Sequence, residues 1–178
     1  MRLKKEGDAP EFKLKDMNGN IYALENKREK PILLSFYRYA SCPLCNLRIH
    51  NLISNYDEYS KEFDVVAVFQ SSQELISKYV GKQSIPFPLL ADPEQNIYKK
   101  YGVEVSWVGF FKAWILRVPT ILNAITKGFL PGSMQGHAHR IPADFLIGTD
   151  NKIIYAFYGK DIGDHISIDT IYKELRNE

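Results

Sequence analysis

The chain has 178 residues, and its 45% hydrophobic and 25% charged content is typical of one globular domain. The net charge of +2 is too small for a basic nucleic-acid-binding surface, so we expect no nucleic-acid partner. The basic N-terminus has no apolar run behind it, and charges and Pro119 interrupt every window long enough to cross a membrane. We therefore expect one domain over residues 1–178, without a transmembrane segment and located in the cytoplasm.

The predicted elements alternate between strands and helices. Runs of strand-forming apolar residues predict strands, and apolar residues at three-and-four spacing predict helices. Asn18-Gly19 predicts a tight turn, Ser41 a helix N-cap, and Ser71 with Glu74 a capping box. In chain order we expect a hairpin over 12–24, a buried strand over 31–37, a helix over 45–63, a strand over 65–69, a helix over 71–82, a short helix over 95–101, strands over 142–147 and 152–158, and a helix over 167–176. This alternation predicts a mixed α/β sheet.

The segment from Val105 to Ala143 contains no acidic residue but many large apolar ones. We expect it to form a helical insertion at about 104–140, before the last strands of the sheet. It could cover the active site, form the face of a homodimer, or lie on a membrane surface, since Lys112, Arg117 and Lys127 punctuate it. Core or dimer packing is preferred to lipid contact, because a small domain must bury its aromatic residues.

Cys42 and Cys45 are the only cysteines, and they form a Cys-x-x-Cys pair at a predicted strand-to-helix turn. Backbone N–H groups and the helix dipole favour a thiolate at a helix N-terminus, so Cys42 is the candidate nucleophile. Cys45 lies one turn deeper and can attack a mixed disulfide or a sulfenic acid on Cys42. Ser41 and Pro43 flank the nucleophile, and Pro43 is tolerated near such a helix start.

Arg38 lies four residues before Cys42, where a cation could favour the thiolate. The alternative is a surface arginine paired with an acid. Two inert core cysteines, or a metal site completed by His50, His137 or His139, are alternatives to a redox pair. The histidines lack the usual zinc-ligand spacing and are predicted to be solvated loop residues, so we expect neither a metal nor another cofactor.

Four motifs are distributed along nearly the whole chain. They are Gly7-Asp8-Ala9-Pro10 with Phe12, Leu14, Asp16 and Gly19, Tyr37-Arg38-x-x-Ser41-Cys42-Pro43-x-Cys45, Pro86 to Pro93 running into Tyr101-Gly102-Val103, and Pro142 to Ile147. These motifs resemble those of the redoxin group, the peroxiredoxins of the AhpC/TSA type, and the resemblance is greatest to peroxiredoxin-like proteins that carry Cys-x-x-Cys. It implies a thioredoxin-like, three-layer α/β fold with an N-terminal β-hairpin extension.

The resemblance also implies a substrate groove beside the cysteines. In thioredoxin-like folds the proline at the place of Pro142 is usually cis and packs against the cysteine pair. Pro142 would then shape the groove, and Ile141 would offer backbone hydrogen bonds to a partner. An ordinary trans proline at a strand start is the alternative. The candidate substrate-binding residues are Arg38, Ser41, Pro43, Arg140, Ile141 and Pro142.

Three positions depart from the patterns of related proteins. Tyr39 stands where peroxiredoxins have a threonine, and Ser35 stands where they have a proline. The strand over 31–37 also lacks an acid that could act as a buried proton acceptor, as in thioredoxin, and Ser41 replaces the tryptophan found there. The group that orients a peroxide is therefore not where the family pattern puts it.

These features predict a thiol-dependent oxidoreductase, a peroxiredoxin-like antioxidant, in which Cys42 and Cys45 cycle between dithiol and disulfide. Its substrate would be a peroxide or a protein disulfide, and a thioredoxin-like or small-thiol reductant would restore the dithiol. The surrounding motifs favour a peroxidase, whereas Cys-x-x-Cys and the missing threonine favour disulfide exchange. A thioredoxin-fold redox-sensing or binding module without turnover is the alternative from another class.

Overall fold

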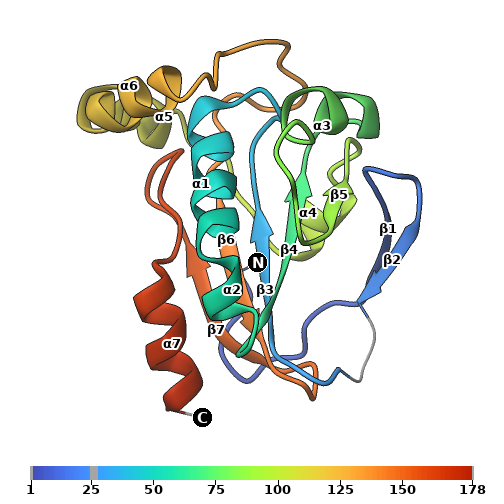
Figure 1. Ribbon diagram of the computed structural model, residues 1–178. Coiled ribbons are helices and arrows are strands. Elements are labelled where there is room, and N and C mark those ends of the chain that lie inside the picture. Colours follow the sequence, from blue (N-terminus) through green and yellow to red (C-terminus); the bar gives the residue numbers. More distant parts are fainter. Residues whose placement is uncertain (1, 25–27, 178) are drawn as a thin grey trace.

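The computed structural model describes residues 2–24 and 28–177, which form one mixed sheet with helices around it (Figure 1). The strand that leads to the cysteines, β3 (Ile32–Phe36), lies inside the sheet, parallel to one neighbour and antiparallel to the other. Across the sheet the described strands are β2 (Ile21–Leu24), β1 (Phe12–Asp16), β5 (Leu89–Ala91), β4 (Asp64–Phe69), β3, β6 (Ala143–Ile147) and β7 (Ile153–Tyr158).

Helices pack on both faces of this sheet and create three layers. All five residues of β3 are buried; Leu33 belongs to the core on one face, and Leu34 and Phe36 belong to the core on the other. The predicted three-layer α/β architecture with a strand buried on both faces is therefore confirmed. The first core includes residues of α1 (Pro43–Ser54), α2 (Tyr56–Tyr59), α3 (Gln73–Tyr79) and α7 (Ile168–Arg176), and the second includes residues of α4 (Asn96–Lys100).

The N-terminal hairpin forms as predicted. Gly19 adopts a positive φ of 91° in the turn, where a side chain would be strained. The carboxylate of Asp16 accepts hydrogen bonds from the backbone N–H groups of Asn18 and Asn20, each at 2.8 Å. β1 also pairs with β5, so the hairpin extends the edge of the main sheet.

The predicted helical insertion consists of α5 (Trp107–Leu116) and α6 (Val118–Thr126), between α4 and β6. An isolated antiparallel bridge between Val105 and Arg140 closes its base. The two helices meet at a bend of 73°, and Figure 1 shows them at one end of the sheet, beside the start of α1. The insertion therefore lies at the cysteine end of the molecule.

Two local expectations were wrong. The helix predicted over 45–63 is interrupted at Asn55, so that α1 and α2 are separate. The N-cap of α3 is Ser72, not Ser71. The hydroxyl of Ser71 instead accepts a hydrogen bond at 2.9 Å from the backbone N–H of Ala40, in the loop before the cysteines. Ser71, which its sequence spacing predicts to be a helix cap, thus makes a tertiary contact instead.

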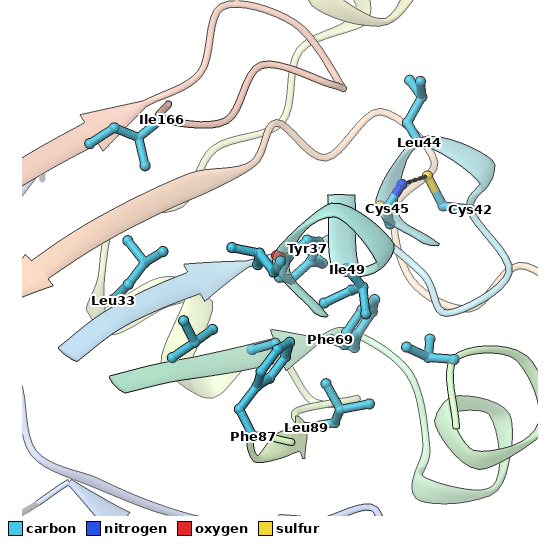
Figure 2. Close-up of a cluster of buried hydrophobic side chains, with 14 of the residues drawn as sticks. Leu33, Tyr37, Cys42, Leu44, Cys45, Ile49, Phe69, Phe87, Leu89 and Ile166 are labelled. Carbon is cyan, nitrogen blue, oxygen red and sulfur yellow. Dashed lines mark hydrogen bonds between the residues drawn. The ribbon is translucent and has the colours of Figure 1, made fainter. Parts of the chain in front are cut away.

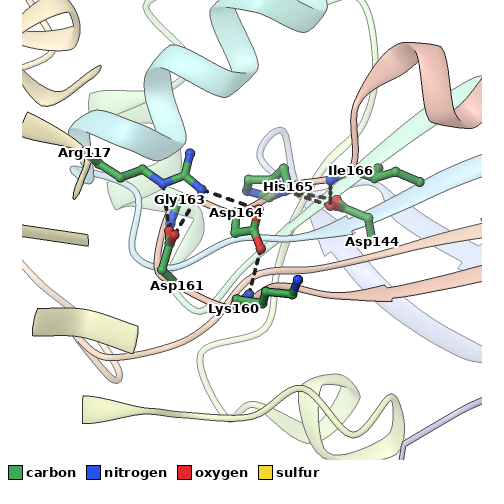
Figure 3. Close-up of polar contacts among 8 residues, drawn as sticks. All are labelled: Arg117, Asp144, Lys160, Asp161, Gly163, Asp164, His165 and Ile166. Atoms are coloured by element: carbon green, nitrogen blue, oxygen red, sulfur yellow. Dashed lines mark hydrogen bonds and ion pairs between the residues drawn. The ribbon is translucent and has the colours of Figure 1, made fainter. Parts of the chain in front are cut away.

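Asp144 on β6 is a fully buried carboxylate that holds the loop before α7 (Figure 3). It accepts hydrogen bonds from Ser35 Oγ at 2.6 Å and from the Ile166 backbone N–H at 2.8 Å, and His165 Nδ1 lies 3.0 Å away. Burial alone would raise the pKa of Asp144, but His165, Arg48 and Ser35 outweigh it and hold that pKa below its ordinary value. Asp144 therefore remains charged within the core.

Arg117, at the junction of α5 and α6, anchors the insertion to the same loop. Its Nε and Nη2 donate to the two carboxylate oxygens of Asp161 at 2.8 and 3.0 Å, and Nη2 also reaches Asp164 at 3.4 Å (Figure 3). Such a two-point arginine–carboxylate contact fixes orientation as well as distance. The insertion is thereby tied to the body of the domain on the side of α7.

We expect Asp144→Ala to lower the free energy of unfolding by about 3 kcal/mol or more, because it leaves Ser35, His165 and the Ile166 N–H buried without their acceptor. Urea unfolding followed by circular dichroism measures this change in the free energy of unfolding.

The depressed pKa of Asp144 in the folded state contributes stability that is present above the unfolded-state pKa, about 3.9, and is lost as pH falls through the folded-state pKa. Below about pH 4 the wild type should thus lose stability more steeply than Asp144→Asn. Equal acid sensitivity of the two proteins would show that Asp144 is not charged in the folded state.

Candidate active site

Cys42 is the N-cap of α1, directly after the loop that follows β3. Its Sγ accepts a hydrogen bond from the backbone N–H of Cys45 at 3.2 Å (Figure 2), and Pro43 occupies the first turn as predicted. The predicted N-cap, Ser41, does not cap the helix; its hydroxyl donates to the carbonyl of Ser133 at 2.7 Å. The sulfur of Cys42 thus sits where the free N–H groups of α1 favour negative charge.

Both cysteines are reduced and buried, with 0% of Cys42 and 2% of Cys45 exposed. Asn46 fixes the backbone around them, because its Nδ2 donates to the carbonyl of Ala40 at 2.7 Å and to that of Cys42 at 3.0 Å. Asn46 was not among the predicted site residues, because a lone asparagine in a helix gives no sequence signal for this role. The cysteine loop is therefore held rigidly at the start of α1.

Arg38 lies beside the sulfur and is only 3% exposed. Its Nη2 donates to Cys42 Sγ at 2.9 Å, and its Nη1 donates to the carbonyl of Ala138 at 2.7 Å. Of the two roles predicted for Arg38, the structure places it at the thiol and not on the surface. Its Nε is buried and has no hydrogen-bond partner among the described residues.

The two cysteines differ sharply in acidity. Burial would raise the pKa of Cys42, but the hydrogen bond from the Cys45 thiol, the charge of Arg38 and the Cys45 backbone N–H together lower it to about 6. Burial and the neighbouring Cys42 sulfur raise the pKa of Cys45 well above its ordinary value. At neutral pH Cys42 is therefore mostly a thiolate, and Cys45 remains a thiol.

A surface segment over residues 129–139, here called the strap, crosses the cysteine loop without forming a helix or strand. Its Gly136 has a φ of +79°, and a Cβ there would lie 2.6 Å from the side chain of Gln70. The strap therefore passes too close to Gln70 for a larger residue at that point. Among its hydrogen bonds to the body are those from Arg38 to Ala138, Ser41 to Ser133, Gln70 to His137 and the Ser72 N–H to Gln135.

Tyr39 and Gln70 also shape this site. Tyr39, at the place of the family's threonine, is 8% exposed, and its ring centre lies 5.1 Å from the guanidinium carbon of Arg38. Burial raises the pKa of Tyr39 to about 12, so its hydroxyl keeps its proton at neutral pH. Gln70 follows β4 and joins the strap to Arg140. A polar residue after a buried strand was the only signal for Gln70 in the sequence.

The structure does not bring Arg140 to the cysteines. Arg140 is buried between Gln70, the carbonyl of Val103 and the side chain of Gln95, and its guanidinium lies over the ring of Tyr98. These contacts fix the base of the insertion. We therefore regard Arg140 as a structural residue and not as a substrate ligand.

The expectations for Ile141 and Pro142 also need correction. Pro142 is trans, since the described residues contain no cis peptide bond, and it lines a surface pocket that includes neither cysteine. The backbone N–H of Ile141 donates to the carbonyl of Glu104 at 3.0 Å, so it is not free for a partner. The Ile141 side chain does belong to the same apolar cluster as the cysteines. The insertion thus occupies the edge where the resemblance places a substrate groove.

The metal-site alternative is not supported by the geometry. Within residues 2–24 and 28–177, no group of three or more histidine, cysteine, aspartate or glutamate side chains is placed to hold an ion. His139, predicted to be solvated, stacks on Trp107 with ring centres 4.1 Å apart. The ring of His50 instead faces the ring of Phe129, with ring centres 5.7 Å apart. Within the described residues, the two cysteines therefore form no ligand group with these histidines.

Comparisons with known proteins agree with this geometry. The chain is 31% identical over 127 residues to peroxiredoxin Bcp of Escherichia coli strain K12, an alignment that covers 69% of this chain and 81% of that protein. The solved structure of peroxidoxin BcpB from Mycobacterium tuberculosis superimposes with a TM-score of 0.71 and 18% identity, covering 99% of this chain and 98% of that one. A thiol peroxidase structure from Chromobacterium violaceum gives a TM-score of 0.69 at 16% identity and covers 99% of this chain and 88% of its own.

These structural matches confirm the thioredoxin-like fold of the peroxiredoxins. The AhpC/TSA family matches residues 6–156, a range that includes β1 to β6 and both cysteines. The sequence motifs, the fold and this match together show that the chain belongs to the AhpC/TSA family.

Proposed function

We propose that this protein is a thiol peroxidase in which Cys42 attacks the peroxide and Cys45 resolves the product. The observation that carries the proposal is the 2.9 Å contact of Arg38 Nη2 with a Cys42 sulfur whose pKa is lowered to about 6. The name of the E. coli relative, peroxiredoxin, supports the same activity. A structural cysteine would need neither a buried cation nor a lowered pKa.

In the first step the Cys42 thiolate attacks one oxygen of the peroxide. A sulfur–oxygen bond forms, the oxygen–oxygen bond breaks, and the departing alkoxide or hydroxide takes up a proton, leaving a sulfenic acid on Cys42. Nε and Nη2 lie on the same edge of the planar guanidinium, so the unpartnered Nε of Arg38 is directed to the side on which Nη2 binds the sulfur. This N–H can donate to the peroxide oxygens as charge develops on them.

In the second step Cys45 attacks the Cys42 sulfur. A disulfide forms, the sulfur–oxygen bond breaks, and the proton lost by the Cys45 thiol leaves with the hydroxide as water. The raised pKa of Cys45 keeps it from competing with Cys42 for the first attack. The two residues are one helical turn apart at the start of α1, so little movement is needed to bring the sulfurs together.

The burial of Cys42 favours a small peroxide over a protein disulfide as the first substrate. No part of Cys42 is exposed beneath the strap, and a protein disulfide must approach in line with the attacking sulfur. A protein disulfide reductase remains the second candidate, favoured by the Cys-x-x-Cys spacing. A thioredoxin-like or small-thiol reductant, supplied by a reducing compartment such as the cytoplasm, would then restore the dithiol.

We expect Cys42→Ser to consume no hydrogen peroxide, because it lacks the thiolate. Cys45→Ser should consume one equivalent and stop, because the sulfenic acid on Cys42 is not resolved into a disulfide. Stopped-flow peroxide consumption without reductant measures both. Activity of Cys42→Ser equal to that of the wild type would contradict the assignment of roles. Rapid reduction of a protein disulfide without peroxide consumption would favour the second candidate.

The pH dependence of Cys42 alkylation tests the role of Arg38. In the wild type the rate of Cys42 alkylation should rise with pH through a midpoint at about pH 6, because only the thiolate reacts. Arg38→Met removes the cation and its hydrogen bond to the Cys42 sulfur. The pH midpoint of alkylation should therefore rise by about 2 pH units, and the alkylation rate at pH 7 should fall about tenfold.

Arg48→Met is the matched control. Arg48 is an arginine of α1 that donates to the Ile166 carbonyl and not to a cysteine, so its loss should leave the midpoint in place. A midpoint that is the same in Arg38→Met and the wild type would refute the proposed activation of Cys42.

A further inference from the structure

The outer surface of α5 and α6, here called the apolar face, consists of large exposed side chains. They are Trp107, Val108, Phe111, Trp114, Ile115 and Leu116 of α5 and Val118, Leu122 and Ile125 of α6. Val108 and Ile115 are 78% and 77% exposed, Phe111 is 61% exposed, and Trp107 and Trp114 are more than half exposed. Of the two expected kinds of packing, core or dimer, the exposure of most of these side chains contradicts core packing, and dimer packing stays a prediction. Contiguous exposure of this kind marks a surface that binds something apolar.

The fully buried positions of α5 and α6 hold small residues. Gly109, Ala113 and Ala124 are the buried positions of the two helices. A Cβ on Gly109 would lie 2.7 Å from the Ile141 side chain, so a large residue does not fit there. A helix on a globular protein normally buries its large apolar residues, whereas most of the large apolar residues of these helices are exposed, and Phe110 and Ile121 pack partly buried against the core. The orientation of the helices is fixed, and it directs most of the large side chains outward.

The charges around the apolar face are positive. Lys112 and Lys127 are exposed on α5 and directly after α6, and the sequence from Val105 to Ala143 has no acidic residue. The flanking acids are already paired: Glu104 with Arg2, and Asp161 and Asp164 with Arg117. The ligand that complements this surface is apolar with negative charges at its edge.

Neither α5 nor α6 is long enough to cross a lipid bilayer by itself. Among the described residues no single helix is both long and apolar enough to cross a bilayer, although the bent pair passes on combined length and composition. α5 has 10 residues and α6 has 9, and each is about half as long as a span requires. Short helices with tryptophan, phenylalanine and lysine instead match elements that lie in the membrane interface.

We infer that the apolar face docks on the surface of a phospholipid bilayer that carries anionic headgroups. A second copy of the chain is the weaker candidate, because a two-fold contact through this face brings like-charged lysines together with no acid in the segment to pair with them. The aromatic side chains enter the interface, and Lys112 and Lys127 meet the headgroups.

Docking places the cysteine end of the domain at the bilayer. α6 packs on α1, and the strap that follows α6 exposes Leu130 and Met134 while its Ser133 carbonyl binds Ser41, next to Cys42. The apolar face, the strap and the cysteine loop are thus neighbours at one end of the molecule (Figure 1). This inference concerns location and does not depend on the proposed peroxidase activity.

Tryptophan fluorescence and vesicle flotation test the inference directly, because both tryptophans of the chain, Trp107 and Trp114, lie on the apolar face. The probes are vesicles of phosphatidylcholine with phosphatidylglycerol and vesicles of phosphatidylcholine alone. We expect the reduced protein to float with the anionic vesicles with a blue-shifted emission, and to bind the neutral vesicles more weakly. Added salt should weaken binding to the anionic vesicles, because it screens the lysines.

Paired variants show which residues bind. Phe111→Ser with Ile115→Ser should lower binding to anionic vesicles at least tenfold, whereas Ile21→Ser, which removes an equally exposed apolar residue on β2, should not. Lys112→Gln with Lys127→Gln should weaken binding to the anionic vesicles only. Circular dichroism confirms that each variant is folded.

Two results would overturn the inference. One is a wild type that binds neither vesicle. The other is a wild type that sediments as a dimer and whose tryptophan emission changes on dilution, which would identify a second copy as the occupant. Vesicle binding by Cys42→Ser, measured without peroxide, separates this test from that of the proposed function.

Discussion

The contact between the Arg38 guanidinium and the Cys42 sulfur is the interaction on which the rest of this site depends. A thiolate that is 0% exposed is stable only if a cation and hydrogen-bond donors replace the water it has lost. Arg38 supplies the cation, and the backbone N–H of Cys45 supplies a donor. Arg38 is itself buried, so the attraction between its guanidinium and the Cys42 thiolate offsets the desolvation cost of both charges.

The same arginine connects the chemistry to the architecture. One of its nitrogens binds the thiolate and another binds the carbonyl of Ala138, 100 residues further along the chain. Arg38, which activates Cys42, therefore also holds the strap beside the cysteine loop. The insertion before the strap is anchored by Arg117 to Asp161, and its apolar face is directed away from the body. One end of the sheet thus carries the reactive sulfur, its cover and an exposed apolar surface.

Sequence patterns were sufficient for the parts of this structure that depend on neighbouring residues. Apolar runs identified the strands other than β5, and Pro43 indicated that Cys42 lies close to the start of α1, although the predicted N-cap was Ser41. Contacts between distant segments left no such signal. The buried carboxylate of Asp144 on β6, for example, is adjacent to Ser35 on β3 only after the strands pair. Resemblance also misplaced the groove, because the insertion uses the backbone of Ile141.

The central claim is that Cys42 is the attacking thiolate and Cys45 its resolving partner. Peptide mass mapping of the wild-type protein after one equivalent of hydrogen peroxide, without reductant, tests it most directly. The account predicts an intramolecular Cys42–Cys45 disulfide, detected as the loss of two hydrogens from the peptide that holds both residues. Oxidised Cys45 beside a free Cys42 thiol, or a disulfide only between two chains, would contradict it.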